Sequence, residues 1–342
     1  MDKVYRIKQI QNLFETTITR EALLQAENNG LIPKADRQKG GVKARFWNVQ
    51  QLPLIGERYG FLKKLSSPTV VTVFTTKGGS YKSTLSYNIA RLSALHNIKT
   101  LAIGLDLQCD LTTLLGLYSD SIENLEDALL EVDEISGLGS YFNKQKKLDD
   151  IIQQTDIPSL YVIPETPDLS PLERAISITT RREFWFKENV IEQLKNEFEL
   201  IVIDCPPSWS QLISNALVAC DILISPIECQ INHFRNLETF RKLSEEFRNE
   251  LNLNYQHIFV PTKYTPTRKL SGEILSWYLK NVSNVTVNFV RESVFGEEAN
   301  ASNLSLLEYA PTQLVAHELR ELLKEIWVKI ASPSLQINKK VA

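Results

Sequence analysis

The sequence predicts an α/β protein, with a mostly parallel, twisted sheet flanked by helices and a small winged helix-turn-helix domain in front of it. From Thr69 onward, apolar runs of strand length alternate with stretches of helical periodicity, which is typical of a parallel sheet with crossover helices. A glycine turn rich in lysine joins the first such strand to the first such helix. Residues 1–65 hold 12 Lys and Arg against 6 Asp and Glu, whereas the whole chain has a net charge of −3. A basic N-terminal module therefore precedes an acidic body.

The first two helices are expected over residues 4–14 and 19–29. Apolar side chains recur at helical spacing in both segments. Thr16 or Thr19 can cap the second helix, and Gly30 is a typical stop signal. The short interval between the two helices indicates a helix-turn-helix unit.

A two-stranded wing is expected next, because Gly40-Gly41 is a good hairpin turn within the segment from Arg37 to Trp47. Asn48 can cap a further helix that runs through Ile55. The run T-R-E-A-L-L-Q-A-E-N-N-G-L-I-P also resembles the MerR-type DNA-binding motif. The recognition helix would then enter the major groove. The expected DNA contacts are Thr17, Thr19, Arg20 and Gln25 in or just before this helix, and Lys39, Lys43 and Arg45 on the wing. The alternative is a solvated basic cap without a DNA role, which the charge balance and the glycine wing disfavour.

The second domain is expected over residues 66–342, after a linker at Lys63 to Pro68. Strands are expected near 69–75, 100–105, 160–163, 200–205, 221–225, 256–261 and 285–290, and helices near 82–96, 183–197, 209–219, 233–249, 271–281 and 312–330. Residues 110–155 indicate an acidic insertion of short helices, and residues 331–342 a frayed tail.

The glycine turn after the first strand of this domain has the chemistry of a phosphate site. Backbone N–H groups at a helix start, together with the helix dipole, favour a bound anion. Lys82 can neutralise the β- and γ-phosphates, and Ser83 can supply a hydroxyl to Mg²⁺. The residues expected around a nucleotide are Lys77, Gly78, Gly79, Ser80, Tyr81, Lys82, Ser83 and Thr84.

Two carboxylates are expected at the same edge of the sheet. Asp106 follows the second strand, and Asp204 ends the apolar strand I-V-I-D in the shape of a Walker B segment. The carboxyl ends of parallel strands form the ligand edge, so both acids are candidates for water and magnesium chemistry. The alternative for each is a capping aspartate with a structural role only.

The turn resembles the deviant Walker A box of the ParA/MinD ATPases, in Lys77 with Gly78-Gly79 and in Lys82-Ser83-Thr84. Tyr81 and the N-terminal module are similar to the large, SopA-like plasmid-partition ParA proteins. The resemblance implies an ATPase that uses ATP and Mg²⁺ and releases ADP. In it Lys77 would reach across a nucleotide-sandwich homodimer, Asp106 would orient the attacking water and contact the magnesium shell, and Asp204 would hold that shell. The adenine would lie near Pro261, Thr262 and Lys263.

The family function implied is ATP-dependent partition of plasmid or chromosomal DNA. The dimer would bind nonspecific DNA in the ATP state, a ParB-like centromere-binding adaptor would stimulate weak hydrolysis, and the N-terminal module would autoregulate the operon at its operator. The expected location is the bacterial cytoplasm on the nucleoid, without a membrane, since no run of eighteen apolar residues exists. The alternatives are a MinD-like membrane-surface ATPase, a cargo-positioning ATPase and a nucleotide-sensing repressor.

One segment departs from the family pattern. SopA-like proteins carry a basic cluster after V-R-E, whereas residues 290–299 here read V-R-E-S-V-F-G-E-E-A. The nonspecific DNA face therefore cannot be copied from the family, and its candidates are Arg268, Lys269, Lys280, Arg291 and Arg320. The four cysteines and four histidines show no metal-ligand spacing, which predicts reduced thiols and no zinc site.

Overall fold

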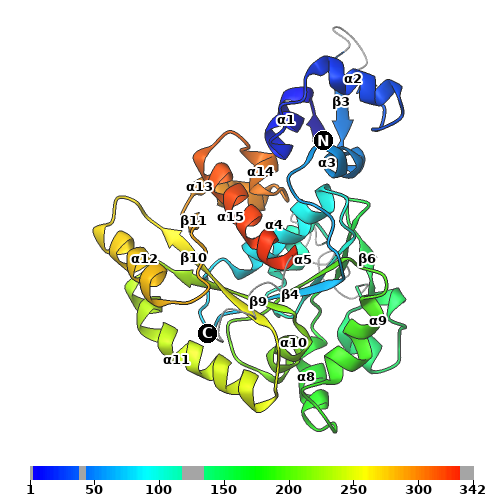
Figure 1. Cartoon of the computed structure of the whole chain (residues 1–342). Coiled ribbons are helices and arrows are strands. Elements are labelled where there is room, and N and C mark those ends of the chain that lie inside the picture. Colours follow the sequence, from blue (N-terminus) through cyan, green and yellow to red (C-terminus); the bar gives the residue numbers. More distant parts are fainter. Residues whose placement is uncertain (1–2, 38–43, 118–134, 332–342) are drawn as a thin grey trace, which may run out of the picture.

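An eight-stranded sheet forms the centre of the chain in the computed structural model, which describes residues 3–37, 44–117 and 135–331 (Figure 1). The strands lie in the order β11-β10-β9-β4-β8-β5-β7-β6. All of the paired neighbours are parallel except β6 and β7. The bounds are β4 Thr69–Val73, β5 Thr100–Gly104, β6 Gln153–Gln154, β7 Leu160–Ile163, β8 Leu200–Asp204, β9 Ile222–Glu228, β10 Gln256–Tyr264 and β11 Val290–Arg291.

Helices cover both faces of this sheet. The helices are α4 Lys82–Leu95, α5 Asp110–Leu114, α7 Leu138–Phe142, α8 Leu169–Ser177, α9 Glu192–Leu194, α10 Gln211–Ala219, α11 Ile231–Glu250, α12 Lys269–Asn281, α13 Val294–Ala301, α14 Leu306–Tyr309 and α15 Leu314–Ala331, with short turns η2 Asp149–Ile151 and η3 Lys187–Ile191. One hydrophobic core joins α4, α14 and α15 to one face. A second core joins α8, α10, α11 and α12 to the other. Figure 1 shows α15 beside α4 on the first of these faces.

The N-terminal module contains helices and a three-stranded antiparallel sheet in the order β1-β3-β2. Its elements are β1 Val4–Tyr5, α1 Ile7–Phe14, α2 Arg20–Asn28, β2 Asp36–Arg37, β3 Arg45–Asn48, η1 Val49–Gln51 and α3 Leu52–Tyr59. The expected first helix was wrong at its start, because Val4 and Tyr5 pair with Asn48 and Trp47 in the sheet. The expected Gly40-Gly41 turn lies outside the described residues.

Most of the expected body elements are confirmed. The seven expected strands are found at their positions, although the last is only the short β11 and an isolated bridge between Phe259 and Val285. The helix expected over 183–197 was wrong as a single element, because the chain forms the π turn η3 followed by the short α9. The sequence missed α8, α13 and α14, and the expected tail beyond residue 331 lies outside the described residues.

A buried polar network joins the N-terminal module to the body. The Tyr5 hydroxyl donates to Glu308 Oε1 at 2.6 Å, and Arg91 of α4 pairs with Glu308 at 2.6 Å and with Asp156 at 2.9 Å. Side chains from both sides of position 65 belong to one hydrophobic core. The division of the chain at residue 65 stays a prediction.

Close packing at the end of α4 completes this junction. A Cβ atom on Gly56 of α3 would lie 2.0 Å from the Leu95 carbonyl oxygen, so only glycine allows this approach. The His96 ring accepts a hydrogen bond from the Phe61 N–H at 3.2 Å and bonds the Leu92 carbonyl through Nδ1 at 2.7 Å. The C-terminal end of α4 therefore contacts the N-terminal module.

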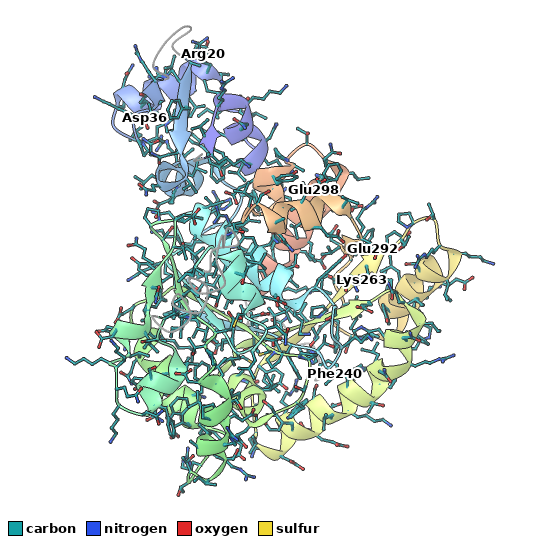
Figure 2. All side chains as sticks on the ribbon, turned by 180° about the vertical axis from the view of Figure 1, so that it is seen from behind. Arg20, Asp36, Phe240, Lys263, Glu292 and Glu298 are labelled. Carbon is teal, nitrogen blue, oxygen red and sulfur yellow. The ribbon has the colours of Figure 1, made fainter. Side chains whose placement is uncertain are left out.

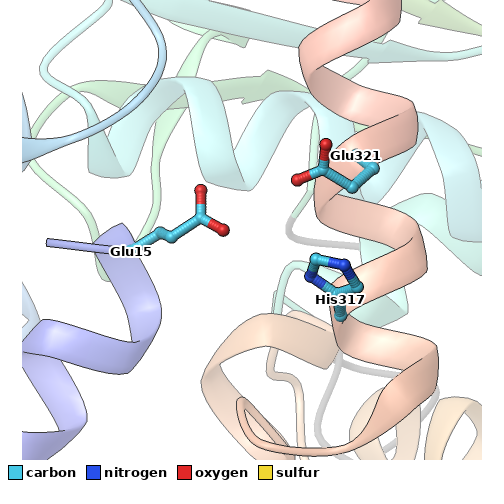
Figure 3. A group of neighbouring side chains, drawn as sticks. All are labelled: Glu15, His317 and Glu321. Atoms are coloured by element: carbon cyan, nitrogen blue, oxygen red, sulfur yellow. The ribbon is translucent and has the colours of Figure 1, made fainter.

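An exposed charge cluster lies at the edge of the same junction. Figure 3 shows Glu15, which follows α1, facing His317 and Glu321 of α15. Lys324 pairs with the carboxylates of both Glu15 and Glu321. A positive charge already lies between the two acids, so this cluster is an ion-pair contact between module and body.

Candidate nucleotide-binding site

The phosphate loop runs from the end of β4 to the start of α4. Gly79 and Tyr81 adopt left-handed backbone conformations, with φ of 68° and 70°. Tyr81 is the residue that precedes the first residue of α4, so the turn closes immediately before the helix begins. The expected strand, glycine turn and helix are therefore confirmed, with the helix N-terminus facing the loop.

Lys82 is held over this loop. Its ammonium group donates to the carbonyl oxygen of Lys77 at 2.9 Å, and the Ser80 hydroxyl donates to the same oxygen at 3.0 Å. Burial lowers the pKa of Lys82, while the charges of Asp204 and Asp106 oppose that shift. The ammonium group is thus fixed beside the loop with two acids near it, in a position suited to an anionic ligand.

Asp204 ends β8 and is fully buried. The Ser86 hydroxyl donates to Asp204 Oδ1 at 2.7 Å, and Oδ2 has no hydrogen-bond partner among the residues that the structure describes. Burial raises the pKa of Asp204 to about 6, and nearby Ser83, Ser86 and Lys82 oppose the shift. A buried carboxylate with a spare oxygen beside a lysine and a serine hydroxyl fits the coordination shell of Mg²⁺.

Asp106 lies half-buried in the loop after β5. Its Oδ1 accepts a hydrogen bond from the Gln108 N–H at 3.1 Å. This is the local contact expected of an aspartate that caps a turn. Its charge also acts on Lys82 and on Asp204, and it raises the pKa of both. The structure therefore brings Lys82, Asp106 and Asp204 to one edge of the sheet.

The end of β10, where residues 261–263 are expected to lie near the adenine, contacts the phosphate loop. The Thr262 hydroxyl donates to the Ser80 carbonyl at 3.3 Å. The Lys263 ammonium lies 5.4 Å from the centroid of the Tyr81 ring and pairs with Glu228 at 3.2 Å. The sequence missed the Lys263–Glu228 pair. The signal that could have found it is that both residues lie at the carboxyl ends of neighbouring parallel strands.

A hollow of about 600 Å³, its open mouth included, lies beside Tyr81 and Thr84. Its lining includes residues of α13 that the sequence left without a role, and Arg291 of β11, which was a candidate for the nonspecific DNA face. Among them, Asn300 Nδ2 donates to Thr84 Oγ1 at 3.3 Å, and Arg291 is held by Glu318 of α15. Residues of the segment 290–299 therefore form part of the wall of this hollow.

Lys77 lies half-buried on the other side of the loop, next to α11. It lines a separate hollow with His233 and Phe240. Burial lowers the pKa of His233 to about 4, and the charge of Lys77 adds to the effect. Lys77 thus lies at the rim of the site. Its carbonyl oxygen accepts hydrogen bonds within the loop, and its side chain lies on the side of α11.

The candidate DNA contacts lie apart from this loop. Figure 2 shows Arg20 at the far end of the N-terminal module from Lys263. Thr17, Arg20 and Gln25 are exposed, while Thr19 caps α2 by accepting from the Ala22 N–H at 3.2 Å. Arg45 forms an ion pair with the buried Glu27. Lys39 and Lys43 lie outside the described residues.

Several curated proteins are similar to this chain over most of its length. The chromosome partitioning protein ParA of Myxococcus xanthus (strain DK1622) is 26% identical over 225 residues, which are 65% of this chain and 70% of that protein. The sporulation initiation inhibitor protein Soj of Bacillus subtilis (strain 168) is 26% identical over 261 residues, 75% of this chain and 97% of that protein.

Solved structures share the fold. A putative plasmid partition protein from Borrelia burgdorferi B31, bound to AMPPNP, superposes with a TM-score of 0.61 at 22% identity. The match covers 78% of this chain and 100% of that protein. The cobyrinic acid a,c-diamide synthase from Mycobacterium smegmatis, with a bound ATP analog and magnesium, has a TM-score of 0.57 at 22% identity. The match covers 71% of this chain and 93% of that protein.

A family model described as an AAA domain (AAA_31) matches residues 68–257, more than half of the chain. This range includes β4, the phosphate loop, Asp106 and Asp204. The chain therefore belongs to this AAA domain family and has the fold of the ParA/MinD-type P-loop ATPases.

Proposed function

We propose that the protein is a ParA-type partition ATPase that binds ATP with Mg²⁺, dimerises in the ATP state and associates with nonspecific DNA. The observation that carries the proposal is the pair of lysines, Lys77 and Lys82, on one loop that faces Asp106 and Asp204. The partition proteins among the relatives support the same function. The cytoplasm, on the nucleoid, is the location that fits it.

The residues of the loop divide the chemistry between them. Lys82 neutralises phosphate charge from a fixed position, because the Lys77 carbonyl holds its ammonium group. Asp204 Oδ2 and the Ser83 hydroxyl would hold the shell of Mg²⁺, which would supply positive charge to offset that of the phosphates. Asp106 orients the water that attacks the γ-phosphate.

The base of the nucleotide is proposed to lie in the hollow beside Tyr81. Thr262 is part of its lining and bonds the loop, so the end of β10 connects the base region to the phosphates. Lys263 and Glu228 close the loop on that side. Asn300 fixes the far wall through Thr84.

Two substitutions test the ATPase and its dimer. Lys77→Ala is expected to bind ADP like the wild type but to fail to dimerise with ATP, because its side chain acts on the second subunit. Asp106→Ala is expected to bind ATP and dimerise but to stall before hydrolysis. Calorimetry, sedimentation and phosphate release measure the three properties. Normal dimerisation and hydrolysis by Lys77→Ala would reject the role of this lysine across the dimer.

DNA binding is proposed at two places. The exposed Arg20 and Gln25 of the N-terminal module would read an operator and autoregulate the operon, whereas the body would bind random-sequence DNA only as the ATP dimer. Affinity for phosphates should fall with log salt at a slope of about −0.9 for each neutralised phosphate. Full-length protein is titrated on a random duplex and on its own upstream DNA, with ADP and with a slowly hydrolysed ATP analogue. Arg20→Ala should lose operator binding and keep the ATP-dependent random-duplex binding.

A ParB-like adaptor is the proposed stimulator of hydrolysis. Phosphate release from full-length protein on DNA is expected to rise on adding the adaptor, and an unchanged rate would contradict this part of the proposal. A role in cell division is a second candidate, because the cell division protein PomZ of Myxococcus xanthus is 24% identical over 258 residues. No random-duplex binding in either nucleotide state would favour a nucleotide-sensing repressor.

The membrane-surface alternative has less support. The apolar side chains of α15, among them Leu319, Leu322 and Ile326, are buried in the core. In the part of the chain that the structure describes, no helix is both long enough and apolar enough to span a bilayer. Binding of full-length protein to anionic vesicles in the ATP state would favour this alternative over DNA partition.

A further inference from the structure

A buried acid from a neighbouring strand fills the space above Gly104, the last residue of β5. A Cβ atom at Gly104 would lie 2.0 Å from Glu165 Cδ and 2.2 Å from Glu165 Oε1. Glu165 follows β7, the parallel neighbour of β5, and is fully buried. The carboxyl group of Glu165 therefore occupies the volume that a side chain at position 104 would take.

Glu165 also ties β7 to α5. Its carboxylate accepts from the Thr112 N–H at 2.8 Å and from the Thr112 hydroxyl. The Glu165 N–H in turn donates to Thr112 Oγ1 at 2.9 Å. Thr112 is fully buried, so these reciprocal bonds fix the start of α5 against the sheet.

This contact brackets the segment that carries Asp106. Gly104 is the register partner of Asp204, and the Leu105 N–H donates to the Asp204 carbonyl at 3.0 Å. Asp106 follows directly, and Thr112 ends the segment. The segment from Gly104 to Thr112 is thus bonded to β8 at its first end, where Glu165 also packs against Gly104. At its other end, Thr112 is hydrogen-bonded to Glu165.

We propose that Glu165 is a positioning residue for the ATPase site: its carboxyl group replaces the side chain that β5 lacks at Gly104 and holds Asp106 in place. The proposal rests on the proposed function, because Asp106 matters only if the site hydrolyses ATP. Burial raises the pKa of Glu165 to about 8, the Thr112 bonds oppose this, and the charge of Asp204 adds to it. A carboxyl group that stays largely neutral adds little negative charge to the pair Asp106 and Asp204, which supports a positioning role.

The kinetic test compares three variants of the full-length protein. Glu165→Ala is expected to lower kcat by about ten- to a hundredfold, since small misplacements of catalytic groups have effects of this size, with ATP affinity within about twofold of wild type. Glu165→Gln keeps an acceptor oxygen for Thr112 and is expected to stay near the wild-type kcat. In Gly104→Asp/Glu165→Ala, the new carboxyl group lies near the vacated volume, and part of the lost kcat is expected to return.

A second measurement does not depend on activity. Hydrogen exchange of the amides from 104 to 116 in the nucleotide-free protein is expected to speed up in Glu165→Ala and not in Glu165→Gln. Glu199→Ala is the matched control, because Glu199 accepts from the Lys99 N–H at 2.9 Å at the opposite ends of β5 and β8. It should leave the exchange of these amides unchanged.

The outcomes separate this proposal from the proposed function. Wild-type exchange in Glu165→Ala, or a kcat for Glu165→Gln as low as that of Glu165→Ala, overturns the positioning role. Faster exchange in Glu165→Ala, together with no ATP hydrolysis by the wild type under any condition, overturns the ATPase and leaves the Glu165 contact established as a tether of this loop.

Discussion

Two buried carboxylates near opposite ends of α4 show how the same group serves different purposes. Glu308 lies at the junction with the N-terminal module, and Asp204 lies at the phosphate loop. Burial alone would raise the pKa of Glu308, but the charge of Arg91 and hydrogen bonds from Arg91, Ser305 and Tyr5 lower it to about 2. Burial raises the pKa of Asp204 to about 6, because its partners only partly oppose the shift.

The difference lies in the number of partners. Glu308 accepts bonds at both oxygens from Arg91, Ser305 and Tyr5, so its charge is fully compensated within the protein. Asp204 leaves Oδ2 without a hydrogen-bond partner among the described residues. A saturated buried acid stabilises a junction, whereas an unsaturated one is prepared for a ligand that brings positive charge.

The largest effect is expected at the junction. Arg91→Met should lower the free energy of unfolding by about 3–5 kcal/mol, because it leaves Glu308 buried without its cation. Urea denaturation of the full-length protein without nucleotide measures the change. Arg182→Ala is the control, since Arg182 and Glu183 form an exposed pair whose loss should have an effect of about 0–1 kcal/mol. Equal losses in both variants would contradict the comparison.

The next largest effect is expected on ATP binding. Lys82→Ala should weaken ATP binding by about a hundredfold or more, equivalent to about 2.7 kcal/mol, because a charge-assisted contact to phosphate is removed. Calorimetric titration measures the dissociation constant. An affinity like that of the wild type would reject the phosphate-loop assignment.

Substituting Asp204 is expected to have a smaller effect on the free energy of unfolding than substituting Arg91, and to raise it rather than lower it. Its folded pKa lies above its unfolded value of about 3.8, so its contribution to stability falls as the pH rises from about 4 through 6. Asp204→Asn removes this fall and should stabilise the nucleotide-free protein at pH 7.5 by about 1–2 kcal/mol.

Unfolding at pH 4.5 and 7.5 checks this prediction, and Glu308→Gln is the matched variant at the junction. Because the pKa of Glu308 is lowered, neutralising its charge should destabilise the protein at pH 7.5. The contrast between the two acids fails if both substitutions shift stability in the same direction.

The smallest effect concerns His96. Burial lowers the pKa of His96 to about 4, and the neutral ring accepts from the Phe61 N–H. Its contribution is therefore complete above its unfolded pKa of about 6.5 and is lost as the pH falls toward 4. Wild-type protein should lose about 1 kcal/mol more than His96→Gln between pH 7.5 and 5.5. Identical pH profiles of unfolding would show that this ring does not titrate on unfolding.

The phosphate loop was predictable because all of its parts are contiguous in the sequence. Asp106 and Asp204 were predictable because parallel strands bring their carboxyl ends to one edge. The Arg91–Glu308 pair joins residues 217 positions apart, and each looks like an ordinary helix charge until the fold is known. Glu165 was missed for the same reason, since only the packing shows that it fills the volume above Gly104.

The N-terminal helix was predicted too long for a related reason. Val4 has helical spacing with the residues that follow, but its pairing with Asn48 in the three-stranded sheet outweighs that local preference. Short strands of this kind depend on a partner far away in the sequence, which a periodic pattern cannot supply.

The close fit between α3 and the end of α4 limits how such proteins can exchange modules during evolution. A recombination near residue 65 would separate Gly56 from the Leu95 carbonyl that it packs against, and Tyr5 from Glu308. A foreign module with any larger residue at the position of Gly56 would collide with the backbone of α4. Successful chimeras should therefore be those in which both sides of this contact are inherited together.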